Sequence, residues 1–345
     1  MKAAVLKEQF KFVIQETEMP RIKADEVLIK VKSAGICSSD VKAYMGIHPE
    51  IKYPVILGHE FSGEIAAAGK EVKHLQVDDE VIAEPLFPCN KCRACVSGKY
   101  NLCNEQKMIG QNIPGAFAEY VIAKGSMTYP KDGFLSFDEA ALIETLATAV
   151  HAVKRSRIGI GDTMVILGAG SVGLLCLQVA KRSGATVLIA DMDQEKLHLA
   201  ADLDADYVIS PGTGDLQEMV LALTNGYGAN IIMDCAGTKD SLRQTVELAC
   251  RGGNIVLVGW TGDQADSISL TRVTMDEKNL IGTMNYCHDF PIAIDLANSG
   301  YVNLKSIITH EFELSQIPEA FSKLSGKDHS IIKAVINFSE SYDNA

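Results

Sequence analysis

The apolar positions of the first 145 residues fall in short runs that alternate with polar positions. Glycine, proline and aspartate separate the runs, and these residues favour turns. Short strands at this spacing predict a compact β barrel or sandwich. The clearest of the runs are KAAVL, KFVIQ, EVLIKVKSAG, GEIAAAG, DEVIAEP and FAEYVIA.

From about Asp162 to Thr283 the pattern changes, because apolar strand-like runs alternate with stretches of helical periodicity. Strands separated by helices of this length build a parallel, doubly wound sheet. After about Asn285 the chain continues with two helical stretches and a final apolar strand, IIKAVINF. The sequence therefore predicts an α/β plus β protein, with a β-rich domain of residues 1–147 and 285–345 interrupted by an α/β domain of residues 148–284.

Composition and charge narrow the class of protein. A chain of 345 residues exceeds what one hydrophobic core usually serves, which agrees with two domains. The net charge of −12 argues against nucleic acid or an anionic membrane as a partner, and no apolar run reaches membrane-spanning length. Nine cysteines without a signal-peptide pattern indicate a reducing cytoplasm. We expect an acidic cytoplasmic enzyme that acts on small molecules.

The segment PCNKCRACVSGKYNLC carries four cysteines at the spacing Cys-x2-Cys-x2-Cys-x7-Cys. Such steps let one loop supply the four soft ligands of a closed tetrahedral zinc site. Two disulfides or four buried thiols are the alternatives, and the loop composition, rich in Pro, Asn, Lys and Gly, disfavours them. A closed site leaves no position for substrate, so we expect a structural zinc held by Cys89, Cys92, Cys95 and Cys103.

A glycine motif, Gly168-Ala169-Gly170-Ser171-Val172-Gly173, directly follows the strand-like run TMVIL and opens a helical stretch. In this context the glycines permit a tight turn, close approach of a pyrophosphate and close helix packing. The next strand ends in Asp191, whose carboxylate suits the ribose hydroxyls of NAD and repels the 2′-phosphate of NADP. The sequence therefore predicts an NAD site.

Three dispersed residues have the side chains that a catalytic zinc needs. Cys37, His59 and Glu144 could be its three protein ligands, with Glu60 as an alternative donor. Each also has an ordinary explanation: a buried thiol, a core histidine, and a carboxylate at a helix N-terminus. Spacing alone does not join ligands this far apart, so the residues by themselves leave both interpretations open.

Seven segments along the chain match one known family in order and separation. They are GICSSD, YPVILGHEFSGEI, the four-cysteine loop, GAFAEYVI, IETLATAVHA, VILGAGSVGLL and MNYCHDFP. Through them the chain resembles the zinc-dependent medium-chain alcohol dehydrogenases, and more narrowly their polyol branch of sorbitol and galactitol-1-phosphate dehydrogenases. This resemblance implies a GroES-like catalytic domain interrupted by a Rossmann domain, with the active site in the cleft between them. It also implies a homo-oligomer, either a dimer or a tetramer.

The resemblance assigns two zinc ions per chain. Cys37, His59 and Glu144 match the catalytic zinc ligands, and Glu60 matches a carboxylate beside the metal. The four-cysteine loop matches the structural zinc site.

Three further residues match the surroundings of the catalytic zinc. Ser39 corresponds to the hydroxyl that relays the substrate proton, and Asp40 to a group that holds a ligand histidine in its tautomer. Lys42 stands where sorbitol dehydrogenases usually carry a histidine as the last relay to solvent.

The cofactor is expected to contact the glycine motif and the carboxyl ends of later strands. Lys196 matches a basic position that helps to hold the adenosine end. The expected contacts are Gly168, Gly170, Ser171, Val172, Gly173, Asp191, Lys196, Cys235, Ala236, Val258, Gly259 and Trp260.

The substrate is expected to meet Asn285 and Tyr286. Sorbitol-type enzymes carry Arg where this chain has Asn285, and the change is similar to galactitol-phosphate-type enzymes. We therefore expect hydride transfer between NAD and a secondary alcohol of a polyol or a polyol phosphate. The alternatives are a threonine or simple secondary alcohol dehydrogenase and, in another class, a non-catalytic NAD(H)-binding zinc protein.

Overall fold

The computed structural model describes residues 1–131, 133–211, 215–260, 268–326, 328 and 330–338. The chain divides into two compact units, one of Met1–Glu144 with Leu304–Ala345 and the other of Thr145–Asn303. Residues 285–303, which the sequence placed with the β-rich domain, group with the second unit. They do so because Asp289 bonds to His151 and Lys154, and Asn303 bonds to Gln178.

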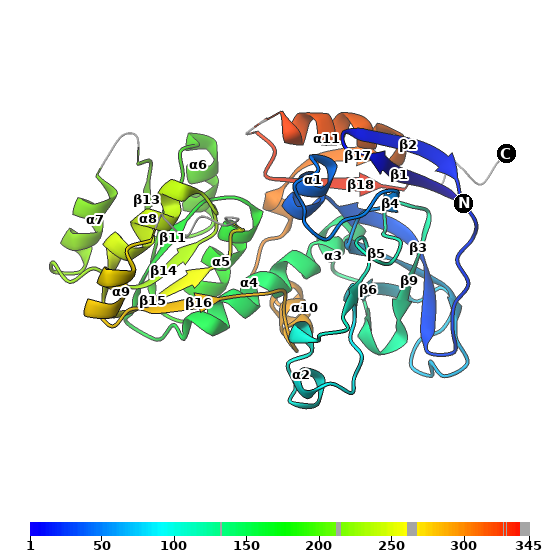
Figure 1. Ribbon diagram of the computed structural model, residues 1–345, viewed down its shortest axis with the longest axis horizontal. Helices are drawn as coiled ribbons and strands as arrows, with labels where there is room; N and C mark the ends of the chain where they lie inside the picture. The colour runs from blue at the N-terminus through cyan, green and yellow to red at the C-terminus, as the bar shows by residue number, and fades with distance from the viewer. Residues whose placement is uncertain (132, 212–214, 261–267, 327, 329, 339–345) are drawn as a thin grey trace. The chain divides into compact units, whose positions relative to one another are not determined.

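The first unit is built on two main sheets (Figure 1). One has the strand order β2-β1-β4, and the larger has the order β10-β6-β5-β3-β18-β17 with β9 also paired to β3. The strands are β1 Lys2–Glu8, β2 Lys11–Glu16, β3 Glu26–Gly35, β4 Val55–Ile56, β5 Glu60–Ala68, β6 Glu80–Ala83, β7 Leu86–Phe87, β8 Lys107–Met108, β9 Tyr120–Lys124, β10 Thr128–Pro130, β17 Ile308–Glu313 and β18 Lys333–Asn337.

Short helices join these strands. Ser136 begins α3 with a capping box, since its hydroxyl accepts the Glu139 amide while the Glu139 carboxylate accepts the Ser136 amide. The helices of this unit are α1 Ser38–Tyr44, α2 Arg93–Val96, η1 Tyr100–Leu102, η2 Gly125–Met127, α3 Phe137–Ala141, η4 Lys305–Ile307, η5 Leu314–Gln316 and α11 Ile317–Ser325; α4 Ile143–Ser156 continues from this unit into the second.

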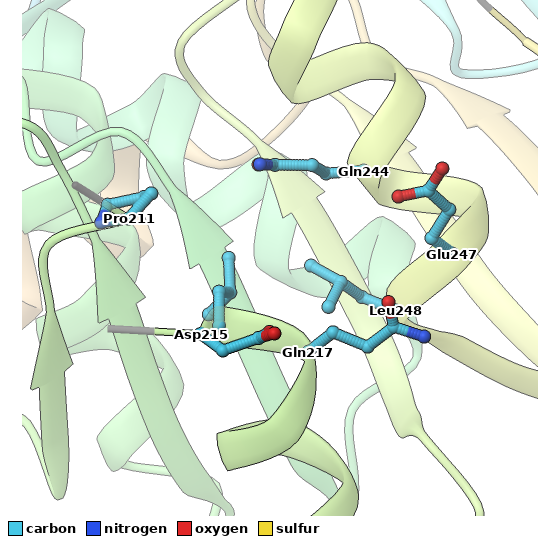
Figure 2. Close-up of a pocket in the computed structure, with 7 residues that line it drawn as sticks. Pro211, Asp215, Gln217, Gln244, Glu247 and Leu248 are labelled. Atoms are coloured by element: carbon cyan, nitrogen blue, oxygen red, sulfur yellow. The ribbon is translucent and has the colours of Figure 1, made fainter. Parts of the chain in front are cut away.

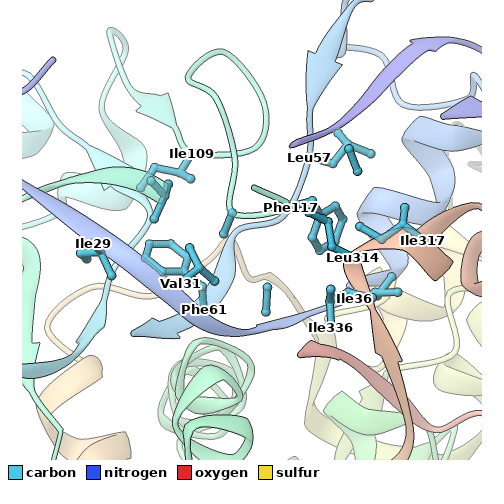
Figure 3. Close-up of a cluster of buried hydrophobic side chains, with 14 of the residues drawn as sticks. Ile29, Val31, Ile36, Leu57, Phe61, Ile109, Phe117, Leu314, Ile317 and Ile336 are labelled. Carbon is cyan, nitrogen blue, oxygen red and sulfur yellow. The ribbon is translucent and has the colours of Figure 1, made fainter. Parts of the chain in front are cut away.

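The core of the first unit joins segments from both ends of the chain. Phe61 and Phe117 are fully buried together with Ile317 and Ile336 of the C-terminal segment (Figure 3). Burying one such side chain contributes about 1.5–3 kcal/mol. The return of the chain after the second unit is therefore required for this core, as the sequence pattern predicted.

The second unit is a parallel sheet of order β13-β12-β11-β14-β15-β16 with helices between consecutive strands. Its inner strands are buried on both faces, as apolar runs such as TMVIL predict. The doubly wound fold class is confirmed. The elements are β11 Thr163–Leu167, α5 Ser171–Lys181, β12 Thr186–Ala190, α6 Gln194–Asp202, β13 Tyr207–Ile209, α7 Leu216–Leu223, β14 Ala229–Asp234, α8 Lys239–Leu248, β15 Ala249–Leu257, α9 Leu270–Met275, β16 Asn279–Gly282 and α10 Phe290–Asn298.

Among the described helices, none combines the length and the apolar composition that a membrane span requires.

Candidate metal centres and dinucleotide site

The four-cysteine loop lies between β7 and β8, and its sulfur atoms converge within 4.8 Å of one another. Cys95 Sγ lies 3.6 Å from Cys92 Sγ and 4.0 Å from Cys89 Sγ. Tetrahedral zinc with Zn–S bonds of 2.3 Å requires a sulfur separation of about 3.8 Å. A hydrogen bond from the Cys95 backbone lowers the pKa of Cys92 to about 6, whereas desolvation and the neighbouring thiols raise the pKa of Cys95 to about 12. The donor set fits a closed structural zinc.

This loop is tied to the rest of its unit by a buried carboxylate. Glu84 accepts hydrogen bonds from Tyr100 Oη at 2.9 Å and from Tyr129 Oη at 2.7 Å. Tyr100 belongs to the four-cysteine loop, whereas Tyr129 belongs to β10. Burial and the Glu84 charge raise the pKa of Tyr129, so its hydroxyl remains a donor. Glu84 was not singled out in the sequence, where only its position beside the loop marks it.

A second group of possible metal ligands consists of Cys37, His59 and Glu60, with ligand atoms within 4.8 Å of one another. The strand register explains why they meet. Gly35, two residues before Cys37, pairs with Glu60 in the antiparallel ladder of β3 and β5. A Cβ atom on Gly35 would overlap the Glu60 carboxylate, so a larger residue here would displace that side chain. One thiol, one imidazole and one carboxylate fit a zinc site with an open position.

Asp40 supports this group from α1. Its carboxylate accepts hydrogen bonds from the backbone amides of Cys37 at 3.0 Å and Gly58 at 3.4 Å, and lies 3.4 Å from His59 Nδ1. Burial alone would lower the pKa of His59, but the charges of Asp40 and Cys37 raise it well above its ordinary value. With Nδ1 turned to Asp40, Nε2 is the imidazole atom left for a metal.

Glu60 also forms a buried ion pair with Lys333 of β18, which the sequence analysis missed. β3 pairs with both β5 and β18, and Gly35 stands opposite Glu60 on one side and Val335 on the other. Burial would lower the pKa of Lys333, but the charges of Glu60 and Cys37 raise it, so the ammonium stays protonated. A lone lysine inside the apolar run IIKAVINF was the available signal, because a buried lysine needs a partner.

The remaining residues predicted around the catalytic metal are placed differently. Glu144 is buried in the first turn of α4 and its charge acts on Lys333, but it lies outside the cluster of possible ligands found among the described residues. Ser39 and Lys42 belong to α1, which begins directly after Cys37. Burial lowers the pKa of Lys42, against the opposing effect of the Cys37 charge.

The glycine motif of the second unit is packed as a dinucleotide loop requires. Gly168 has a positive φ of 102°, and Gly170 is the N-cap of α5. A Cβ atom on Gly173 would overlap the carbonyl oxygen of Gly168, whereas one on Gly170 would meet no atom of the described residues within 4 Å. Ser171 and Val172 form the first turn of α5. The open space at Gly170 is where the loop must let a pyrophosphate approach.

Asp191, at the end of β12, has both carboxylate oxygens engaged by the loop around it. The Ala169 amide donates at 2.7 Å and the Asp193 amide at 2.9 Å. Lys196 follows in the first turn of α6 and is half-buried. The carboxylate is therefore held beside the glycine motif, where a ribose would bind.

Two further loops are joined through Asp234 at the carboxyl ends of the parallel strands. Its carbonyl oxygen accepts the amides of Val258 and Gly259, and its Oδ1 accepts those of Ala236 and Gly237. These loops contain the predicted contacts Cys235, Ala236, Val258, Gly259 and the exposed Trp260. Asp234 itself was missed, although a single acidic residue closing the buried run NIIM was visible in the sequence.

Asn285 and Tyr286 lie between β16 and α10. Asn285 adopts a positive φ of 48°, and the fully buried Tyr286 ring packs against Phe290 with centroids 5.4 Å apart.

The second unit also has a hollow of about 460 Å³ between α7 and α8 (Figure 2). Gln244 and Glu247 of α8 face Gln217 of α7 and its N-cap Asp215 across it. None of the residues that line it belongs to the predicted cofactor or metal sites, so we assign it no role in the reaction.

Comparison with known proteins identifies the class that this fold and these sites define. Residues 23–133 match the alcohol dehydrogenase GroES-like domain, and residues 171–299 match the zinc-binding dehydrogenase family. The chain is 35% identical over 329 residues to a sorbitol dehydrogenase of Halalkalibacterium halodurans, covering 94% of this chain and 95% of the relative. It is 34% identical over 314 residues to a D-arabitol-phosphate dehydrogenase of Enterococcus avium, covering 90% and 89%.

Solved structures of similar proteins support the same family. An oxidoreductase/dehydrogenase of unknown specificity from Escherichia coli superposes with a TM-score of 0.94 at 32% identity, covering 98% of this chain and 99% of that one. An Escherichia coli protein described as a short chain alcohol dehydrogenase, in complex with NADH, superposes with a TM-score of 0.91 at 29% identity, covering 98% and 99%. The chain therefore belongs to the zinc-dependent medium-chain alcohol dehydrogenase family, in its polyol dehydrogenase branch. The predicted family and the GroES-like plus Rossmann fold are confirmed.

Proposed function

We propose that the protein is an NAD-dependent, zinc-dependent oxidoreductase that transfers a hydride between NAD and a secondary alcohol carbon of a polyol or polyol phosphate. The observation that carries the proposal is the convergence of Cys37, His59 and Glu60 on one point, with Asp40 holding the imidazole. The sorbitol and D-arabitol-phosphate dehydrogenases among its relatives support this substrate class.

The metal would be held by Cys37, His59 and a carboxylate, which is Glu60 by proximity or Glu144 by family resemblance. Zinc supplies a Lewis acid that lowers the pKa of an alcohol or polarises a ketone. Ser39, beside the cluster in α1, is proposed to take the substrate proton while its own hydroxyl proton passes to solvent on the side of the half-buried Lys42.

Each of the other protein groups has a part in holding this arrangement. Asp40 keeps His59 in the tautomer with Nε2 free, and Lys333 balances the charge of buried Glu60. The four-cysteine loop is proposed to hold a second zinc that stabilises its lobe.

NAD is proposed as the cofactor because Asp191 is fixed beside the glycine motif as a carboxylate acceptor. Its negative charge favours two ribose hydroxyls and repels the phosphate of NADP. One neighbouring structure contains NADH and another contains NADP, so the neighbours support a nicotinamide cofactor and the choice of NAD rests on Asp191.

We propose a homo-oligomer, a dimer or tetramer, in a reducing cytoplasm. β16 lies at one edge of the parallel sheet, where unpaired backbone groups can join a second copy of the chain. All nine cysteines lie in the described part of the chain and none forms a disulfide, which agrees with a reducing compartment.

Absorbance at 340 nm tests the function with a panel of polyols, polyol phosphates, simple secondary alcohols and threonine, each with NAD and with NADP. We expect NADH formation with at least one polyol or polyol phosphate, lost on chelation. Cys37→Ala should lower kcat/KM by about 1,000-fold or more, because the metal loses a ligand. The matched control is Cys250→Ala, a half-buried thiol of β15 outside both metal clusters. A folded, zinc-loaded protein that is inactive with the whole panel would refute the proposal.

A further inference from the structure

Asp289 is a fully buried carboxylate that the proposed reaction does not use. It accepts a hydrogen bond from Lys154 Nζ at 2.6 Å and lies 2.7 Å from His151 Nδ1; both partners belong to α4. It also accepts the backbone amide of Cys287 at 2.9 Å. Burial alone would raise the pKa of Asp289, but the hydrogen bonds from His151 and Lys154 lower it, so the group is charged at neutral pH.

The position of Asp289 makes this arrangement unusual. Asp289 is the N-cap of α10, a place where aspartate ordinarily accepts an amide of the first helical turn. Here its side chain makes no such bond, and Pro291 in that turn has no amide to donate. The Asp289 carboxylate is turned towards α4 instead. It therefore links α10 to α4 and does not cap α10.

The segment that this link holds is strained. Asn285 and His288 both have positive φ, at 48° and 60°, a left-handed conformation that Asn and His tolerate better than most non-glycine residues but that still costs free energy. Such a conformation persists only where surrounding contacts impose it. The Asp289 carboxylate fixes one end of the segment, and the packing of Tyr286 against Phe290 fixes its middle.

The held segment presents a hydrogen-bond donor. The side-chain amide nitrogen of Asn285 is buried, and no described residue accepts a hydrogen bond from it. A buried donor without an acceptor is costly unless a ligand supplies one. Polyols carry an oxygen on every carbon and can therefore provide the acceptor.

We propose that Asp289, His151 and Lys154 are positioning residues that hold residues 285–288 so that Asn285 donates a hydrogen bond to a substrate hydroxyl. This inference rests on the proposed function for the identity of the ligand, but the link itself does not depend on it. Removing the link frees the strained segment and weakens binding of the polyol more than it affects the metal or NAD.

Asp289→Asn tests the proposal, with Asp295→Asn on the exposed face of the same helix as the matched control. We expect KM for the polyol to rise about ten-fold while kcat and KM for NAD change by less than about three-fold. Amide hydrogen exchange of residues 284–289 should accelerate about ten-fold in Asp289→Asn, measured by mass spectrometry without substrate. Zinc content should equal that of the control.

A second pair of variants covers the case in which Asp289→Asn fails to fold. Lys154 is 53% exposed, so Lys154→Met leaves the core intact while removing one donor. Lys154→Met should accelerate exchange of residues 284–289 and raise KM for the polyol, and Lys154→Arg should restore both because it keeps a charged donor.

The outcomes separate the two proposals. Unchanged exchange of residues 284–289 in both Asp289→Asn and Lys154→Met would overturn the link. A rise in KM for NAD alone would overturn the assignment of the Asn285 donor to substrate. A protein inactive with all polyols would refute the function, whereas the exchange measurement would still decide whether the link exists.

Discussion

Two glycines of the dinucleotide motif have opposite surroundings, although they are only three residues apart. Gly173 has no room for a Cβ atom because the Gly168 carbonyl occupies the space, whereas Gly170 faces open space. Gly173 therefore serves helix packing, and Gly170 serves the ligand. This difference separates the effects that the same substitution should have at the two positions.

We expect Gly173→Ala to lower Tm, because the α5 backbone must shift away from β11, and to weaken cofactor binding as a consequence. Gly170→Ala should leave the Tm of the cofactor-free protein within about 1–2 °C, yet raise the Kd for NADH about ten-fold. Thermal unfolding and NADH fluorescence titration measure the two effects. Equal Tm values for the two variants would contradict this assignment of roles.

Several residues of the site could be predicted because their signal is local. The four cysteines and the glycine motif each lie within one short segment, where spacing alone defines the chemistry. Lys333 and Glu60 are different, because only the pairing of β3 with both β5 and β18 brings them together. Asp234 and Asp289 act by binding backbone amides or other helices, which leave no periodic pattern in a sequence.

At the level of elements, β16 differs from β13, the strand at the opposite edge of the parallel sheet. Leu280 of β16 is 38% exposed, and the neighbouring α9 carries the exposed Leu270 and Met275. Tyr207 of β13 is comparably exposed, at 39%, but lies at the other edge. Apolar side chains at an edge that no described strand covers make β16 the expected contact of the proposed homo-oligomer.

We therefore expect Leu280→Lys to shift the protein towards smaller species, because a lysine on an edge strand opposes pairing with another strand. Tyr207→Lys is the matched control and should leave the oligomeric state unchanged. Size-exclusion chromatography with light scattering measures both. The same mass for both variants, or dissociation only in the control, would exclude β16 as the contact.

Element types followed from the sequence because periodicity reports burial directly. The runs TMVIL and TVLIA became parallel strands, and the stretches between them became helices. The assignment of residues 285–303 depended on long-range bonds instead, since Asp289 and Asn303 find their partners on α4 and α5. A hydrophobic pattern predicts that a segment is helical, but it does not show to which unit that helix will form hydrogen bonds.

On the scale of the whole molecule, the two units have separate hydrophobic cores. The proposed zinc sites lie in the first unit, and the glycine motif lies in the second. Metal and cofactor should therefore stabilise different parts of the chain.

Calorimetry should show this separation. Cys103→Ser should reduce zinc content by about one ion per chain and lower the transition of the first unit, because a closed site contributes folding free energy. NADH at about 100 times its Kd should raise the transition of the second unit, by about 2.7 kcal/mol in stability. Cys250→Ser is the control for loss of a thiol. One transition that shifts as a whole in both experiments would contradict independent stabilisation.

The place of β18 in its sheet has a consequence for how the chain acquires its structure during synthesis. β18 lies between β3 and β17, and it delivers Lys333 to Glu60. The ribosome synthesises all of Thr145–Asn303 before it reaches β18. The second unit therefore has its full sequence while the first still lacks a central strand. Until then Glu60 lacks its Lys333 partner, and the first-encoded half of the enzyme is completed last.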